Sequence, residues 1–189
     1  MKKYVALAAL LACVPGTAIA QDTTNAKLSG VRAEARIGYE TPTVSDSGSI
    51  YKIGSAVSYG GEIGFDLKAK NVTVGPYAVY EFSSVSLCDS TGCLKEDGNL
   101  GAGGRIGFIL GDKTVLYAKV GYARIAFHGT GVLNGFDTHK DGVQGAIGVD
   151  VNLGKNVYLM VEGNYADYGK LFGTNLQRRH LAGGVGFRF

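Results

Sequence analysis

One five-residue pattern recurs four times along the chain and constrains its fold more than any other feature. The copies occupy residues 63–67 (IGFDL), 106–110 (IGFIL), 147–151 (IGVDV) and 185–189 (VGFRF), and they begin 43, 41 and 38 residues apart. Each copy has apolar residues at its first, third and fifth positions, which is the period of a β-strand with one apolar face. Repeats at this spacing predict a regular array of strands.

The same alternation runs through eight segments, which predict strands beginning near residues 31, 57, 72, 99, 114, 142, 157 and 178. The connections between them alternate in length. Long polar segments, predicted as loops, lie at about 41–56, 84–98, 128–141 and 169–177, and short turns lie between the other pairs. Pro76 removes a backbone donor inside the third strand, so we expect a bulge there. Val115 and Arg124 break the alternation of the fifth strand, which we attribute to strand ends. The 30 glycines and the absence of tryptophan argue against a helical bundle.

The first 20 residues have the organisation of a secretory signal peptide. Lys2 and Lys3 precede a short apolar run, and the small residues Ala18 and Ala20 form a cleavage signal. The alternative is lipoprotein processing at Cys13. Cleavage after Ala20 leaves a single domain, 21–189, and lowers the net charge from +3 to +1. This balance gives no electrostatic footprint for nucleic acid.

Three features favour a membrane barrel over a soluble sandwich. Short turns alternate with longer connections, and an even strand number returns both chain termini to the same side of the membrane, as in outer-membrane barrels. Most of the strands reach the length of about 9–11 residues that crosses a bilayer. Aromatic residues form two levels on the apolar face, as interfacial girdles do: Tyr39, Tyr80, Tyr122 and Tyr165 near the loops, and Phe65, Phe108, Phe187 and Phe189 near the turns. We therefore predict an all-β fold, an eight-stranded antiparallel up-and-down transmembrane β-barrel, whose last strand closes against the first.

The strands, together with 116–123 (LYAKVGYA) and 184–189 (GVGFRF), resemble the small outer-membrane β-barrel family of opacity proteins and related surface antigens. Attachment-invasion barrels and the transmembrane domain of outer membrane protein A are similar. The resemblance covers essentially the whole mature chain and implies a bacterial outer-membrane location, contact with membrane lipid and lipopolysaccharide, and no cofactor. It also implies that Phe187 and Phe189 form a signal for the barrel assembly machinery. The chain departs from the family in having no tryptophan in its girdles.

The opposite face of the strands carries charged residues that should point into the lumen. They are Arg32, Glu34, Arg36, Glu40, Glu62, Asp66, Glu81, Arg105, Lys119, Asp150, Glu162, Arg178 and Arg188. Eight strands enclose an interior that side chains can fill, and buried charges must be paired, so we expect a packed polar plug. Glycines on the same face, including Gly107 and Gly186, should leave room for arginine and tyrosine side chains. The alternative is a narrow, porin-like passive channel for small solutes.

Other reactive residues give weaker signals. Cys88 and Cys93 should form a disulfide at the tip of an exposed loop, because exported proteins fold under oxidising conditions. His128, His139 and His180 show no local spacing of a catalytic triad, although triad partners can be remote in sequence. We therefore expect no enzyme and no metal site. The predicted role is structural or surface-interaction, adhesin- or antigen-like, with any ligand bound by the exposed loops.

Overall fold

The computed structural model describes residues 28–46, 49–52, 54–88, 92–132, 134–135, 137–171 and 174–189. The predicted signal peptide and the possible lipidation site at Cys13 lie outside these residues. Among the described residues, no helix is long and apolar enough to span a membrane.

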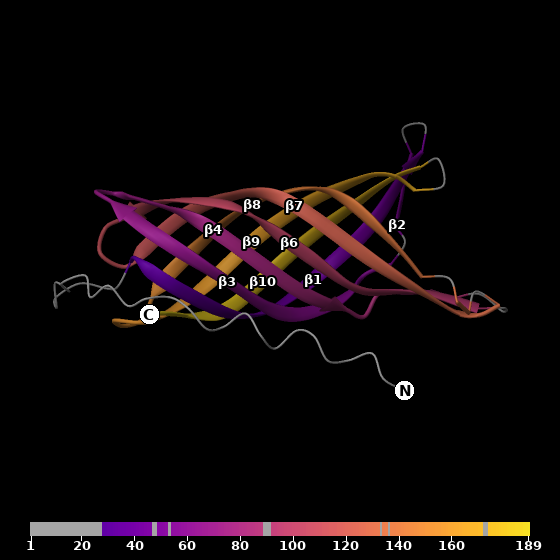
Figure 1. The fold of residues 1–189 in the computed structure, drawn as a ribbon, viewed down its shortest axis with the longest axis horizontal. Helices are drawn as coiled ribbons and strands as arrows, with labels where there is room; N and C mark the ends of the chain where they lie inside the picture. The colour runs from indigo at the N-terminus through magenta and orange to yellow at the C-terminus, as the bar shows by residue number, and fades with distance from the viewer. Residues whose placement is uncertain are drawn as a thin grey trace.

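Eight long strands follow one another around the barrel, each antiparallel to its neighbours (Figure 1). They are β1 (Gly30–Asp46), β3 (Ala56–Ala69), β4 (Val72–Ser83), β6 (Gly92–Leu110), β7 (Thr114–Gly131), β8 (Asp137–Asn152), β9 (Val157–Leu171) and β10 (Thr174–Arg188). Two short strands, β2 (Ser49–Lys52) and β5 (Ser86–Cys88), extend the hairpins at one end. We call this the hairpin end, and the opposite end, which holds the short turns and the C-terminus, the turn end.

The last strand closes the barrel against the first. The β1–β10 ladder runs from the pair Arg32 and Arg188 to the pair Ser45 and Asn175. Beyond the ladder, the backbone N–H of Phe189 donates to the carbonyl oxygen of Val31 at 2.8 Å. This confirms the closed eight-stranded barrel, and closure satisfies the backbone groups that an open sheet edge would leave unpaired in lipid.

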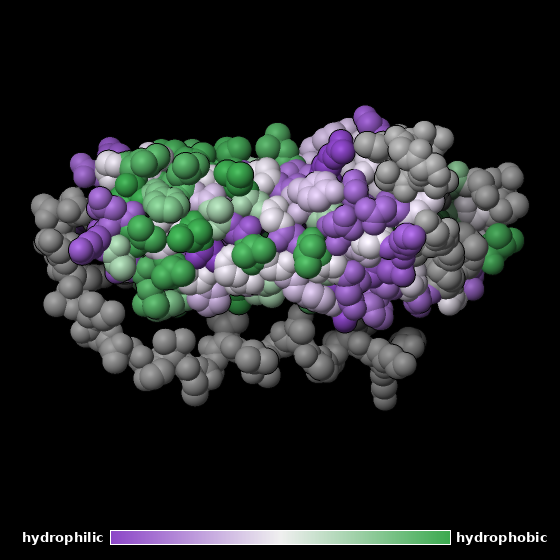
Figure 2. Space-filling model, turned by 90° about the horizontal axis from the view of Figure 1, so that it is seen from above, coloured by the Kyte–Doolittle hydropathy of each residue, from purple (hydrophilic) through white to green (hydrophobic). Residues whose placement is uncertain are grey.

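The two faces of each strand differ sharply in polarity. Ile37 on β1 is 61% exposed, whereas its neighbour Arg36 is 5% exposed. Apolar side chains therefore cover the outside of the barrel, and charged ones fill the inside. Figure 2 shows the apolar side chains gathered over the part of the wall toward the turn end, with polar side chains covering the other end. This is the reverse of a soluble barrel and is the pattern that a bilayer requires.

The prediction of four long loops was wrong in extent, because strands continue through most of these segments. Outside the apolar band the polarity of the wall inverts. Arg124 faces out and pairs with Asp141 at 2.6 Å, while the next residue, Ile125, is fully buried. Arg124 therefore lies within β7, not at a strand end as predicted; Val115 does lie at the start of that strand and faces inward. The hairpin end has its own apolar core, formed by Ala123, Ile125, Phe127, Ala166, Tyr168 and Leu176.

At the hairpin end the wall divides into two groups of strands. The β8–β9 ladder stops at Val143 and Asp167, but β8 stays paired with β7 as far as Asp137. Strand β9 likewise stays paired with β10 as far as Leu171. Figure 1 shows the two groups ending in separate tips, one from β5 to β8 and one containing β9, β10, β1 and β2.

The expected bulge at Pro76 is absent from the described ladders. The β3–β4 ladder has the same register before and after this position, and Pro76 pairs with Gly104 of β6. Register shifts instead occur between Glu96 and Gly98 and between Asn175 and Gln177, both toward the hairpin end. The proline is accommodated by an interruption of the hydrogen-bonding ladder, without an extra residue.

Candidate functional site

All thirteen charged residues predicted for the lumen lie in the barrel interior, each with 6% or less of its surface exposed. Their positions follow from the two-residue period of the strands, since every second side chain of a barrel strand points inward. They come from all eight long strands and meet in three layers along the barrel.

The middle layer is centred on Glu62 of β3. Its carboxylate accepts hydrogen bonds from Arg32 Nη1 at 2.7 Å, from Lys119 Nζ at 2.6 Å and from Arg36. Across the lumen, Glu162 of β9 binds Lys119 at 2.5 Å and Arg36 at 2.6 Å. The layer balances three cations against three carboxylates: Arg32, Arg36 and Lys119 against Glu34, Glu62 and Glu162. Charges removed from water in this way require such pairing.

The layer nearest the turn end is built on two arginines. Arg105 of β6 donates to Asp66 at 3.0 Å and to Asp150 at 2.6 Å. Arg188 of β10 reaches the same Asp150 oxygen at 2.6 Å. Two positive and two negative charges balance here as well, so the layer ties β3, β6, β8 and β10 together without excess charge.

Two tyrosines connect these layers and complete the packing. The guanidinium carbon of Arg105 lies 3.9 Å from the centre of the Tyr117 ring, and that of Arg188 lies 4.3 Å from the Tyr158 ring. The two hydroxyl groups donate to Glu162 and Glu34 of the middle layer at 2.9 and 2.7 Å. Each ring thus bridges a cation on one side and a carboxylate on the other.

Glycines make room for these large side chains. A Cβ atom placed on Gly186 would lie 2.1 Å from the ring of Tyr158, and one on Gly148 would lie 2.4 Å from the ring of Tyr117. Close approach of an aromatic ring to the backbone requires glycine at both positions.

The layer toward the hairpin end has fewer cations than carboxylates. Arg178 donates to Glu40 at 2.5 Å and to Glu81 at 3.0 Å, and the Ser83 hydroxyl also donates to Glu40. His180 Nδ1 lies 3.5 Å from Glu81. Within this layer Arg178 serves both carboxylates, and Glu81 is also 3.3 Å from Arg36 Nε of the middle layer.

The structure brings together a serine, a histidine and a carboxylate that lie far apart in the sequence. Ser58 Oγ is 2.8 Å from His180 Nε2, and Glu81 lies on the other side of the imidazole ring. This is the order of groups in a hydrolytic triad. However, Ser58 is fully buried and Glu81 is held by Arg178, so a substrate carbonyl has no access to the hydroxyl. The arrangement is a packed part of the lumen.

Glu96, within a segment predicted as a loop, is the interior charge that sequence reasoning missed. It lies on β6, four residues beyond Leu100, the last exposed large apolar residue of that strand, and is 3% exposed. Among the described residues, neither of its carboxylate oxygens has a hydrogen-bond partner. Burial, with the nearby Glu40 carboxylate, raises the pKa of Glu96 to about 8. The register shift after Glu96 gave no signal in the sequence.

The residues predicted for the outer girdles all lie on the outside of the barrel. Their exposed fractions are 57% for Tyr39, 43% for Tyr80, 42% for Tyr122, 44% for Tyr165, 37% for Phe65, 50% for Phe108, 49% for Phe187 and 63% for Phe189. Tyr59 and Phe82 join the tyrosine level, where their rings stack at 5.5 Å.

The remaining predicted positions lie at the hairpin end. A disulfide joins Cys88 and Cys93, which face each other across the β5–β6 ladder. His128 Nδ1 contacts Asp137 at 2.6 Å on the exposed surface, and His139 is exposed on β8. Within the described part of the chain, no group of three or more metal-ligating side chains is positioned to hold a metal ion.

A closed antiparallel barrel with an apolar outside, aromatic rings and an ion-paired interior is a membrane-spanning β-barrel of the outer-membrane type. The family described as outer membrane protein beta-barrel domain matches residues 5–189, and the chain belongs to this family.

Two solved structures show the same fold. Neisserial surface protein A is 18% identical with a TM-score of 0.60, and the match covers 85% of this chain and 98% of that one. Ail, the attachment invasion locus protein of Yersinia pestis, in complex with the heparin analogue sucrose octasulfate, is 16% identical with a TM-score of 0.57. That match covers 85% of this chain and 99% of Ail. No curated protein matches the chain.

Proposed function

We propose that this protein is an integral barrel of the bacterial outer membrane that presents its hairpin end to the exterior as a surface-interaction module, adhesin- or antigen-like, with a lumen closed to solutes. The observation that carries the proposal is the change in polarity along the wall. Outside the apolar band the strands continue, but they carry polar side chains outward and an apolar core inward. A purely structural anchor has no need of this second, water-exposed section.

The closed lumen is supported by the three ion-pair layers. Arg32 and Asp150 are fully buried, and Arg36 joins carboxylates on strands β3 and β9 across the interior. An ion pathway would need water beside such groups. In a passive channel, removing the cross-lumen pairs would alter an existing current; in a plug, it would create one.

The interaction role is supported by the shape of the hairpin end and by the related folds. Two separate tips project there, and the Cys88–Cys93 disulfide constrains one of them. One protein of the same fold is called a surface protein, and the other carries an attachment invasion name and was solved with a heparin analogue. For this chain we propose a ligand bound by the tips. We propose no catalytic step, because Ser58 is buried.

Adhesion of cells tests this role. Bacteria that display the wild-type protein should bind a host-cell or matrix surface better than bacteria carrying an empty vector. A variant with 86–95 and 128–138 shortened to a tight turn should lose this binding and still migrate as a folded barrel in unboiled detergent gels. Unchanged adhesion of the shortened variant would contradict the role of this tip.

Conductance and fractionation test the rest of the proposal. The wild-type barrel should partition with outer membranes and give no reproducible open steps in planar bilayers. Regular steps that disappear on substitution of Arg36 or Glu162 would support the channel instead. Recovery in a soluble periplasmic fraction would refute the membrane location.

A further inference from the structure

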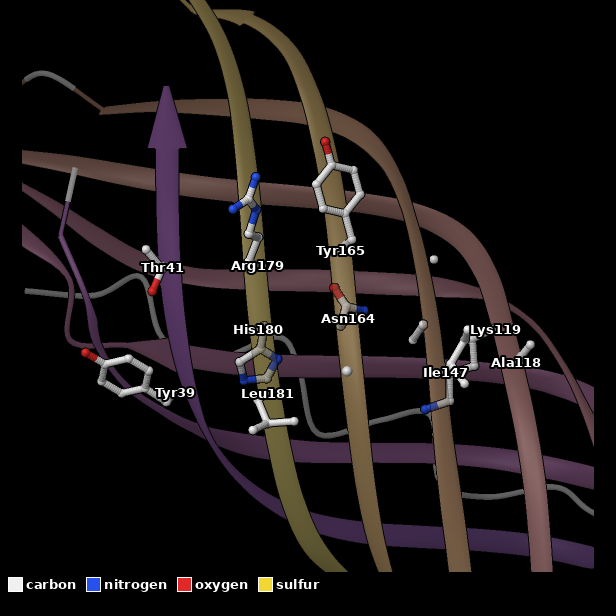
Figure 3. Close-up of a pocket in the computed structure, with 13 residues that line it drawn as sticks. Tyr39, Thr41, Ala118, Lys119, Ile147, Asn164, Tyr165, Arg179, His180 and Leu181 are labelled. Carbon is white, nitrogen blue, oxygen red and sulfur yellow. The ribbon is translucent and has the colours of Figure 1, made fainter. Parts of the chain in front are cut away.

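A shallow groove of about 780 Å³ crosses the outer wall of the barrel, within the apolar band near the hairpin end. Its lining comes from β7, β8, β9, β10 and β1, as the labelled side chains in Figure 3 show. This volume is in the range of small-molecule binding sites. Most of the outer wall carries large apolar side chains, so a hollow in it requires a local cause.

The hollow results from two outward-facing glycines. Gly145 of β8 pairs with Tyr165 of β9, and Gly163 of β9 pairs with Ile147 of β8, so the glycines lie diagonally across one ladder. A Cβ atom on Gly163 would meet nothing within 4 Å, and one on Gly145 would meet only the Lys119 carbonyl oxygen at 3.7 Å. Because both glycines face outward, packing inside the barrel does not require them. Their effect is to leave empty space on the lipid-facing side of the wall.

Apolar side chains stand around this floor. Ile147 is 68% exposed and Leu181 is 61% exposed. Tyr39 and Tyr165 of the tyrosine girdle are 57% and 44% exposed. Such a rim presents carbon and aromatic surface to whatever fills the groove. A flexible hydrocarbon chain can follow a hollow of this kind and bury apolar area along it.

A cation lies at the end of the groove nearest the hairpin end. Arg179 is exposed on β10, opposite Tyr165 and Thr41 in the two adjoining ladders, and Figure 3 shows its side chain beside Tyr165. Among the described residues no carboxylate lies within ion-pair distance of Arg179. Asp167, two residues beyond Tyr165, accepts hydrogen bonds from Asn175 at 3.2 Å and from the backbone N–H of Gly169 at 2.8 Å.

We propose that this groove is a specific site for a lipid of the outer leaflet, with one acyl chain lying over Gly145 and Gly163 and a headgroup phosphate bound by Arg179. The glycine floor lies toward the middle of the membrane and the arginine lies at the interface, which is the order of chain and phosphate in a lipid. Arginine binds phosphate with paired donors and full charge. The proposal rests on the proposed insertion of the barrel in the outer membrane.

Charge favours a lipid over a second copy of the chain in this groove. Two barrels in one membrane would associate about an axis along its normal, which brings identical residues to the same height. The unpaired Arg179 of one copy would then face the other copy's Arg179 at the rim. Like charges across a contact are unfavourable, whereas an anionic headgroup complements the arginine.

Native mass spectrometry of the folded full barrel in neutral detergent tests the site, with diphosphorylated lipid A as the probe. We expect the wild type to retain one lipid A molecule more tightly than the dephosphorylated lipid. Arg179→Gln should lower the affinity for lipid A about fivefold and abolish this preference, because one interfacial arginine contributes about 1 kcal/mol. Gly163→Leu should lower the affinity for both lipids about tenfold by displacing about two methylene groups from the groove.

Matched variants control for general effects. Gly104 is also exposed on the outer wall, and its Cβ would likewise meet nothing within 4 Å, but it lies outside the groove. Gly104→Leu should leave lipid binding unchanged, as should Lys113→Gln at a turn. Gly145→Leu provides a second filled groove if Gly163→Leu fails to fold, which migration in unboiled gels reveals.

Four outcomes would overturn the proposal. Gly163→Leu and Gly104→Leu could change the affinity for lipid A equally, or Arg179→Gln could leave that affinity unchanged. Inorganic phosphate could bind as strongly as lipid A, or the wild type could form a dimer that Gly163→Leu dissociates. If the wild-type barrel migrates as folded but does not bind lipid A, only the lipid site in the groove is rejected. Failure of the wild type to fold or to fractionate with membranes rejects the proposed function.

Discussion

Replacing Glu62 with glutamine is the most direct test of the ion-paired interior. Glu62 is 2% exposed and accepts hydrogen bonds from Arg32, Arg36 and Lys119. The substitution keeps the size of the side chain but leaves three buried cations facing two carboxylates in the middle layer. Breaking a buried ion pair by removing one partner costs about 3–5 kcal/mol, so the free energy of unfolding should fall by about that amount.

Urea unfolding of the barrel in lipid vesicles, followed by circular dichroism and by migration in unboiled gels, measures this change. Asp141→Asn is the matched control, because it breaks the Arg124–Asp141 pair, whose side chains are 44% and 48% exposed. Exposed pairs contribute little, so this variant should unfold close to the wild type.

Charge balance makes a second comparison possible. Adding Lys119→Gln to Glu62→Gln restores equal numbers of cations and carboxylates, so the double variant should be more stable than the sum of the single effects predicts. If Glu62→Gln unfolds at the same urea concentration as Asp141→Asn, the interior charges are solvated and the plug is incorrect.

Three further predictions concern single positions. Glu96 faces Glu40 on β1, Glu81 on β4, Tyr168 on β9 and Arg178 on β10, and burial together with the Glu40 carboxylate raises its pKa from 4.5 to about 8. Between about pH 4.5 and 8 the folded state keeps the Glu96 carboxyl protonated, whereas the unfolded state releases this proton. The contribution of Glu96 to the free energy of unfolding is therefore fully present below about pH 4.5. It is lost as the pH rises toward 8, by up to about 4 kcal/mol. Between pH 5 and 8, the free energy of unfolding of Glu96→Gln should depend less on pH than that of the wild type. Parallel curves for the variant and the wild type would contradict the burial of an unpaired carboxyl. Gly186→Val should displace Tyr158 from Arg188 and Glu34 and destabilise the barrel by about 1–3 kcal/mol in urea unfolding, whereas Gly104→Val should be tolerated. Deleting Phe189, which is 63% exposed, should reduce the yield of assembled barrel in cells more than it lowers the unfolding midpoint of the refolded protein, and equal losses in both assays would argue against an assembly signal.

The sequence by itself determined the architecture and the inside and outside of the wall. The period of two assigns each residue of a strand to one face, and a sustained apolar face over eight segments leaves a closed barrel in lipid as the consistent solution. For this reason the sequence alone places Arg32, Glu62 and Arg188 in the lumen. The alternating lengths of the connections similarly predicted that consecutive strands are neighbours around the barrel.

Only the tertiary structure decided which charges meet and where the membrane section ends. Arg36 and Glu162 are 126 residues apart, and their contact depends on the stagger of the ladders around the barrel, which no local pattern encodes. The segments beyond the band were mistaken for loops because their strands reverse polarity, placing Arg124 outside and Ile125 inside. Glu96 was missed because it lies in one of these segments, beyond a register shift that the sequence does not signal. The groove over Gly145 and Gly163 exists only because neighbouring strands bring two glycines together. Alternation along a strand fixes the face of a residue, whereas its neighbours are set by register and closure.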